Sequence, residues 1–403
     1  PVFAVLAGNG SVRGEFPDLK QAVAAAQSSE TIELRTDGLV KCAPVTIQGK
    51  ALRLRAGAGV RPVLVPDPVS RSMIWSDSAL VLEGLAFELS LEGNDRRLLD
   101  RYSPPALQQH EDIVKLQPGV LSPPLDHSQT LVTMDKASLL ASHCCFRVRD
   151  VYRTTPQAGQ VALRLAGSLH CGLRHCEVQS VHATGVEWDA SQTGRDSVLF
   201  LTNCVCLGIT ALHIDPSQGA ETAIHIERCT LASATVIRVT RVGKQPLTLQ
   251  AQGNVIDADS LLGVPGRGRS MASPPPSWRW DGRDNVYSLR SAFLRTSLAK
   301  PDEFSLQKWR EFWKSDERGS VESGSVETSV TFPKLPLTSG SQTNFSAAQM
   351  EFALAPGESN AIPAAVGAVV SAVGPGKPYH AWKQTPEAAE WERIVAAFLS
   401  SSR

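Results

Sequence analysis

Alternating apolar and polar residues recur along the middle of the chain, and one short motif returns there seven times. Each copy has an alternating strand, a polar step, an anchor residue and an apolar residue two positions on. The anchors are Leu85, Cys144, Cys176, Cys204, Cys229, Asn254 and Asn285. After a first interval of 59 residues they follow one another every 25 to 32 residues. A repeat of this length without helical periodicity indicates a solenoid of strands.

A simple physical argument explains why such repeats stack into a solenoid. A strand of about five residues with one apolar face cannot bury that face alone. Coils stacked at the ~4.8 Å spacing of paired strands bury it continuously. Cys and Asn suit an inward turn position, since Cys is a small buried apolar residue and Asn tolerates left-handed geometry. We therefore predict an all-β, right-handed, single-stranded parallel β-helix. The alternative is a β-propeller, whose blades need about 40 residues and four strands each.

The N-terminal part combines a helix with further strands. Residues 16–27 read as an amphipathic helix, with Pro17 and Asp18 at its start and apolar residues at helical spacing. From Thr31 the period becomes two, in short strands separated by Gly-containing turns. We expect the helix to close the open end of the core; a partner-binding helix is the alternative.

The opening run FPDLKQAVAAAQSSETIELRTDG, the following PVTIQGKALRLRAGAGVRPVL and the late VGPGKPYHAWKQTPEAAEW carry a family resemblance. Together with the repeats, they resemble the β-helix regions of large planctomycete-type bacterial proteins, of the pectin-lyase-like type, several of which follow a serine/threonine kinase domain. The resemblance implies the β-helix fold and no assigned chemistry. The kinase motifs HRD and DFG are absent from this sequence.

Interruptions and a change of composition suggest how the chain is divided. We expect a β-helix over residues 1–300 with insertions at 91–130 and 262–277, and a tail over 301–403 with helices near 303–314 and 386–398. Both insertions, and a smaller one near 154–159, follow ladder anchors. Such loops are either tolerated surface insertions or carriers of function. If they start at one turn of the coil, they should gather on one side of the solenoid.

Composition narrows the partners and the compartment. Forty basic and forty acidic residues give a formal net charge of zero, which removes a global electrostatic case for nucleic acid. No apolar run is long enough for a membrane span. The eight Cys follow the repeat, so we expect free buried thiols, with disulfides or a metal site as alternatives. Free thiols favour a reducing compartment, so we expect a cytoplasmic protein. The opening without Met or a signal sequence suggests a fragment of a longer chain.

Two columns of polar residues are the clearest candidate site. Aligning the strands that follow the anchors places Arg164, Glu187, His213 and Arg238 in one column. Two positions on, Asp189 and Asp215 are one coil apart, so their backbones should lie ~4.8 Å apart. Carboxyl groups about 5 Å apart are typical of retaining glycosidases. These six residues are the predicted ligand-binding set, with Asp189 and Asp215 as candidate catalytic residues.

Structural roles compete with each of these readings. Asp189 and Asp215 sit where a strand meets a turn, a common place for Asp. The motifs of polygalacturonases, NTD, DD, GHG and RIK, are absent, and no calcium-binding Asp cluster is visible. Trp278 and Trp280 could stack on a sugar, but we favour a seal at the end of the core. Three histidines near the ladder read as residues on the coil surface: His143, His170 and His175.

Two functions follow from these patterns. The preferred one is a noncatalytic interaction or scaffold module of a larger bacterial protein, with a protein or polysaccharide partner. The alternative is a carbohydrate-binding or carbohydrate-active β-helix of the glycoside hydrolase or polysaccharide lyase type. We expect no cofactor and no metal in either case.

Overall fold

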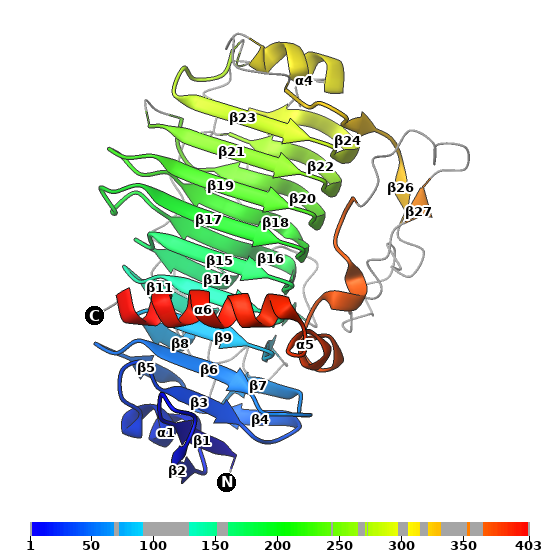
Figure 1. The fold of residues 1–403 in the computed structure, drawn as a ribbon. Helices are drawn as coiled ribbons and strands as arrows, with labels where there is room; N and C mark the ends of the chain where they lie inside the picture. The colour runs from blue at the N-terminus through cyan, green and yellow to red at the C-terminus, as the bar shows by residue number, and fades with distance from the viewer. Residues whose placement is uncertain are drawn as a thin grey trace.

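The chain forms a right-handed parallel β-helix with additional elements at both ends, as seen in a computed structural model (Figure 1). The structure describes residues 2–67, 72–91, 129–150, 160–242, 245–264, 271, 273–296, 305–314, 321–331, 353–354 and 366–401. Strands of successive coils pair in parallel and in register from the third strand to the end of the solenoid. The predicted fold class is therefore confirmed.

Each coil presents three faces. The strands of the first face form one continuous sheet: β3 (Thr31–Leu34), β6 (Leu52–Ala56), β9 (Leu80–Glu83), β12 (Leu139–Ser142), β15 (His170–Arg174), β17 (Ser197–Thr202), β19 (Thr222–Glu227), β21 (Leu247–Gln252) and β23 (Trp278–Arg283). A short turn after each of these strands leads to the second face.

The second and third faces merge along the solenoid. In the early coils they are separate strands: β4 (Gly38–Cys42), β5 (Val45–Ile47), β7 (Pro62–Pro66), β8 (Ser72–Ser76), β10 (Ala86–Leu91), β11 (Thr130–Asp135), β13 (Cys145–Asp150) and β14 (Val161–Ala166). Later coils carry one long strand for both faces: β16 (Glu177–Asp189), β18 (Val205–Asp215), β20 (Thr230–Val239), β22 (Val255–Gly263) and β24 (Val286–Arg295). β16 shows the change directly, because its first part pairs with β13 and its second part with β14.

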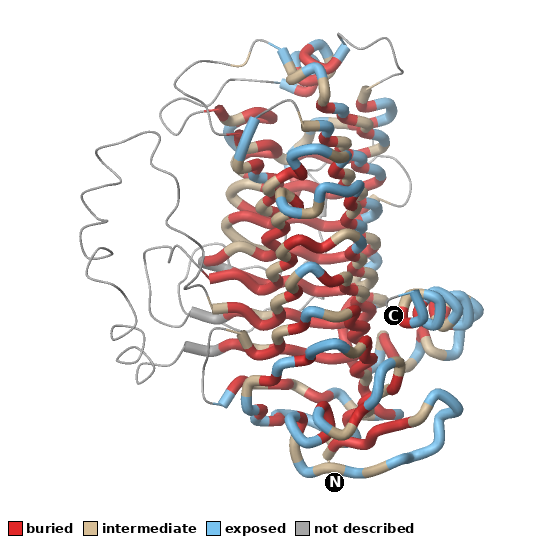
Figure 2. Tube along the Cα trace, turned by 90° about the vertical axis from the view of Figure 1, so that its left-hand side faces the viewer, coloured by how far each residue is buried: buried red, intermediate tan, exposed pale blue. Residues whose placement is uncertain are grey.

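Stacked side chains of like kind fill the interior. Leu82, Leu173 and Leu201 occupy one inward column of the first face and are at most 1% exposed. Phe87 and Phe146 stack with their ring centroids 5.3 Å apart. Burying one such side chain stabilises the fold by about 1.5–3 kcal/mol, so the strand period alone accounts for a large core. Buried positions line the tube from end to end (Figure 2).

The turn between the first and second faces has one fixed geometry. The residue just before each anchor adopts left-handed backbone angles, with φ between 50° and 65°: Gly84, His143, His175, Asn203, Arg228, Gly253 and Asp284. We had assigned this geometry to the anchor itself. The anchor instead points inward and bonds the next coil: the Cys229 amide donates to Asn254 Oδ1 at 2.8 Å, and Asn254 Nδ2 donates to Asn285 Oδ1 at 2.9 Å.

All eight cysteines are buried and free. Cys144, Cys176, Cys204 and Cys229 lie at the same turn of successive coils. Their thiols donate to carbonyl groups of their own or the preceding coil, as Cys204 does to Leu173 at 3.3 Å. Burial raises the pKa of the Cys171 thiol to about 12. The neutral thiol is thus the stable form at that position, as in a packing role.

Short elements cover the two ends of the solenoid. β1 (Phe3–Leu6) pairs with β2 (Val12–Phe16) and β3, and α1 (Leu19–Ala25) turns Leu19 and Val23 inward. This helix lies inside the expected 16–27 range, with Asp18 accepting from the Gln21 amide at 2.8 Å. At the other end lie α4 (Leu306–Trp313) and β25 (Val326–Glu327), and a small hairpin pairs β26 (Val330–Thr331) with β27 (Ala353–Leu354).

The C-terminal segment returns across the solenoid. Residues 366–376, which we call the strap, include the short helix η4 (Val370–Ala372). The strap bonds successive turns: Gly367 N donates to Gly253 O at 2.7 Å, Val369 N to Asn203 Oδ1 at 2.6 Å and Gly374 N to His175 O at 2.9 Å. Its apolar side chains cover outward valines of the second face.

Two helices follow the strap, α5 (Lys377–Trp382) and α6 (Pro386–Ser401). α6 crosses the first face near the middle of the solenoid (Figure 1). The expected final helix at 386–398 is thus present and packs along the solenoid. Among the helices of the described residues, none is both long and apolar enough to cross a lipid bilayer.

Candidate functional site

The predicted polar columns exist and lie on the third face. Strand pairing places Arg164 beside Glu187, Glu187 beside His213, and His213 beside Arg238. These positions come from β14, β16, β18 and β20, because each strand reaches this face at the same point of the coil. Asp189 pairs directly with Asp215 in the second column. The repeat length in the sequence was sufficient to find this register.

The two aspartates are each engaged by a different local partner. Asp189 accepts from the amide and the hydroxyl of Ser191, at 2.9 and 2.5 Å, which is the usual Asp-turn arrangement. Asp215 forms a two-bond pair with Arg241, with nitrogen–oxygen distances of 2.9 and 2.5 Å. Arg241 is half-exposed, so this pair adds little stability. Asp189 thus bonds its own turn through Oδ1, and Asp215 pairs with Arg241 through both oxygens.

The first column holds a buried acid and a neutral histidine. Burial raises the pKa of Glu187, and Arg164, whose Nε lies 3.2 Å from Glu187 Oε1, partly opposes that rise. Burial and Arg238 lower the pKa of His213 to about 4, while Asp215 opposes the change. At neutral pH the column therefore holds, in order, the Arg164 cation, the Glu187 carboxyl group, the neutral His213 ring and the Arg238 cation. Such a ladder can bind polar groups by hydrogen bonds, and within it Glu187 is paired with Arg164.

The insertions do not start at one turn, contrary to our expectation. Residues 91–130 connect β10 to β11, which joins the second face to the third. Residues 262–277 connect β22 to β23, which joins the third face to the first. The number of residues after each anchor does not reveal that each coil has three strands. Residues 92–128 and 151–159 lie outside the described residues, and so do residues 265–270 and 272 of the second insertion.

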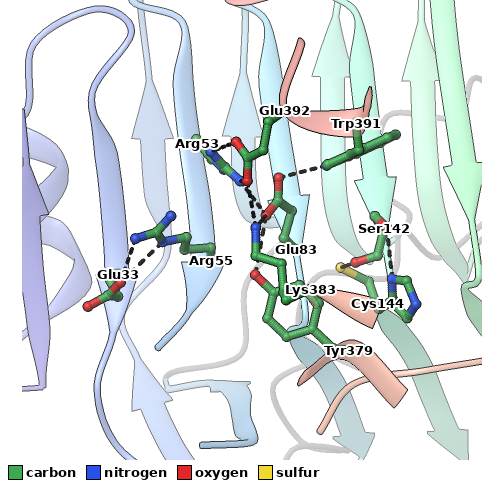
Figure 3. A network of polar contacts seen from close by, with 11 residues as sticks. Glu33, Arg53, Arg55, Glu83, Ser142, Cys144, Tyr379, Lys383, Trp391 and Glu392 are labelled. Carbon is green, nitrogen blue, oxygen red and sulfur yellow. Dashed lines mark hydrogen bonds and ion pairs between the residues drawn. The ribbon is translucent and has the colours of Figure 1, made fainter. Parts of the chain in front are cut away.

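A second polar cluster, which the sequence did not suggest, lies between the first face and the C-terminal helices (Figure 3). At its centre is Glu83 of β9, which is fully buried. It accepts from Arg53 at 2.7 Å, from Trp391 Nε1 at 2.8 Å and from the Tyr379 hydroxyl at 3.3 Å. Arg53 also forms two bonds of 2.7 Å with Glu392 of α6. We call these five residues the Glu83 cluster.

The Glu83 cluster holds the helices in place. Tyr379 lies directly over Gly84, where an added Cβ would come within 2.5 Å of its ring. Lys383 lies 2.6 Å from Glu392, so a second cation supports the α6 carboxylate. All of the charges in the cluster have partners, as buried ions require. One sequence signal was the outward Glu83 on β9, whose other residues are apolar.

Two expectations about single residues can now be judged. His143 is fully buried, with its ring 4.6 Å from those of His175 and Trp382, so its assignment to the coil surface is wrong. Trp382 of the C-terminal segment covers the His143 ring, and the repeat pattern gives no indication of this contact. Trp278 and Trp280 are at most 6% exposed, and Trp280 packs edge-on against Trp309 of α4, so they seal the end of the core.

Within the described part of the chain, no three side chains of His, Cys, Asp or Glu come together in a way that could hold a metal ion. The candidate set therefore offers hydrogen bonds and ion pairs.

Comparisons with known proteins add little beyond the fold. No family model matches the chain, and no curated protein matches it. Among solved structures, it is similar to the crystal structure of a pectin methylesterase mutant in complex with a hexasaccharide, at 10% identity and a TM-score of 0.28. The alignment covers 77% of this chain and 94% of the esterase chain. A likeness this weak carries no argument about activity, and the fold assignment rests on the strand pairing.

Proposed function

We propose that this chain is a noncatalytic β-helix interaction module of a larger bacterial protein. The observation that carries the proposal is the commitment of the candidate carboxylates. Asp189 is held by its own turn, Asp215 by Arg241 and Glu187 by Arg164. A hydrolase of this fold would need an acid and a base free to act on substrate. The proposed role needs only the fixed surface of a rigid solenoid and requires no cofactor.

The resemblance of the opening and closing runs to β-helix regions of planctomycete-type proteins supports a place within a longer chain. Some of those proteins carry a serine/threonine kinase domain, so an accessory role beside a signalling domain is part of the proposal. A reducing compartment such as the cytoplasm suits the eight free thiols.

A carbohydrate-binding or carbohydrate-active role is the second candidate. The column of Arg164, Glu187, His213 and Arg238 favours it, because polar side chains repeat there at the strand spacing. An extended polysaccharide could use such repeated contacts.

The two candidates differ in turnover. The purified chain is incubated with neutral and uronic-acid polysaccharides, and new reducing ends and unsaturated products are measured. We expect none above a heat-treated control. Turnover that disappears in both Asp189→Asn and Asp215→Asn would overturn the noncatalytic role, and the unchanged Asp281→Asn variant, altered on the first face, would show that the loss is local.

A further inference from the structure

The first face is only partly covered. α6 contacts β6, β9 and β15 through charged pairs and through Trp391. The same sheet continues beyond it in β17, β19, β21 and β23 (Figure 1). The outward side chains of these strands include exposed ones. Among the described residues, the part of this sheet beside α6 carries the exposed Phe200.

The charged pairs fix how α6 lies on the sheet. Glu387 contacts Arg174, the last residue of β15, and Glu392 contacts Arg53, which shares an outward column with Gly172. From Glu387 to Glu392, a step of five residues along α6, the contacted position on the sheet therefore shifts by two residues toward the start of the strands. α6 therefore runs antiparallel to the strands of the first face. The same pairs show that its Glu387 side faces later coils and its Glu392 side faces earlier ones.

Helix periodicity then places Ile394. It lies seven residues after Glu387, on the same side of α6, and about 10 Å further along the axis. That distance equals about three strand residues, which brings it level with Cys171 of β15, between the outward positions His170 and Gly172. Ile394 is 43% exposed. It is an apolar side chain on the flank of α6 that faces β15 and β17.

The sheet opposite this flank has a gap and an exposed ring. One outward column runs through Leu140, Gly172, Phe200 and His225. Phe200 is 45% exposed, and one side of its ring stacks on His225 with centroids 4.7 Å apart. On its other side stands Gly172, which has no side chain. A Cβ added there would meet Leu140 Cδ2 at 3.1 Å and only that atom within 4 Å.

We propose that this strip, defined by Gly172, Val198, Phe200 and Ile394, binds an amphipathic α-helix of a partner protein that lies beside α6. Packed helices lie about 8–10 Å apart, which equals about two strand spacings. A helix next to α6 would therefore centre over β15 and β17. The chain itself shows that this face accepts a helix: α6 buries Trp391 and Val395 against it.

The strip also has the make-up of a small recognition surface. Apolar side chains occupy its centre, Leu140 Cδ2 lies beside Gly172, and a large apolar side chain of a partner would contact the side of Phe200 that faces away from His225. Elsewhere on this surface, Tyr379 packs over Gly84, at the turn that follows β9. Polar residues lie at the edges, with exposed His170 on one side and Thr202 on the other. A central aromatic anchor with a polar rim is the usual arrangement in protein interfaces.

This inference rests on the interaction role proposed above and is tested by selection. A displayed library of 16-residue helical peptides is selected against the whole chain, and affinities of the selected peptides are measured for variants. We expect Phe200→Ser and Ile394→Ser each to weaken binding about tenfold. Gly172→Leu should do the same by filling the space. Val242→Ser, which removes a half-exposed valine outside the strip, should leave affinity within about twofold.

Each result is decisive. All variants change surface positions, and their thermal melting is compared first with the parent chain. If no helical peptide is selected, or if binding ignores Phe200 and Ile394, the strip is not a helix site. Dimers of the chain that dissociate in Phe200→Ser would assign the strip to a second copy and overturn the proposal. Neither result bears on turnover, so the noncatalytic role is tested separately.

Discussion

Removing one charge from the Glu83 cluster should detach the C-terminal helices. Glu83→Gln keeps the shape and an oxygen that can accept from Trp391 Nε1, but it leaves Arg53 without its buried partner. Breaking a buried pair by removing one ion costs about 3–5 kcal/mol. Arg53 is 9% exposed at its side chain and retains its two bonds to Glu392, so we place the effect near the lower limit, about 3 kcal/mol.

The expected loss is local. Glu83 contacts α5 and α6, while the solenoid keeps its strand pairing, so the helices should open first. A change of about 3 kcal/mol raises the opening constant by roughly 100-fold. Amide hydrogen exchange of residues 386–401, followed by mass spectrometry, measures that constant directly.

Glu227 provides a matched control. It occupies the same outward column of the first face as Glu83, but its side chain is 51% exposed and pairs with Arg228 at 3.4 Å. Glu227→Gln should change exchange in α6 by less than about 0.5 kcal/mol. Equal protection of α6 in Glu83→Gln and the parent chain would refute the reasoning, since a buried guanidinium that has lost one of its two carboxylate partners would then have no cost.

Three further predictions follow. Burial favours protonation of Glu392, but Arg53 and Lys383 outweigh it and lower its pKa to about 2 from 4.5. The carboxylate therefore contributes its full stabilisation of α6 above pH 4.5 and loses it as the pH falls toward 2. Amide exchange in α6 should rise over that window, and it should rise less in Glu392→Gln. His213 should titrate near pH 4 by NMR, and Arg238→Ala should raise that pKa; a value near 6.5 would show the ring to be solvated. A thiol reagent should label native protein slowly at Cys144, Cys176, Cys204 and Cys229, and labelling of all four within mixing time would contradict their burial.

The repeating part of the structure could be predicted because each coil constrains the next. A strand period and a fixed interval between anchors determine which residues become neighbours, so the pairing of Asp189 with Asp215 followed from counting. What those carboxylates do was not predictable. Ser191 and Arg241 engage them through turn geometry that the strand pattern does not encode.

The contacts that the non-repeating C-terminal segment makes with the solenoid could not be predicted from the sequence. A solenoid pattern describes contacts between adjacent coils only. Trp391 meets Glu83 across 308 positions of sequence, and Trp382 buries His143 in the same way. Nothing in the periodicity of either segment indicates that they meet. An outward Glu on an otherwise apolar strand is the kind of signal that could have pointed to a covering element.

The strap has a consequence for the order in which the molecule can be completed. During synthesis, the coils can stack as soon as each leaves the ribosome, since every coil needs only its neighbour. Glu83 and Arg53, however, remain on an open surface until the final helix has been made. The nascent protein therefore carries an exposed ion pair and bare valines on its second face for most of its synthesis. The strap then ties the turns at His175, Asn203 and Gly253 together, so we expect these coils to open as one unit.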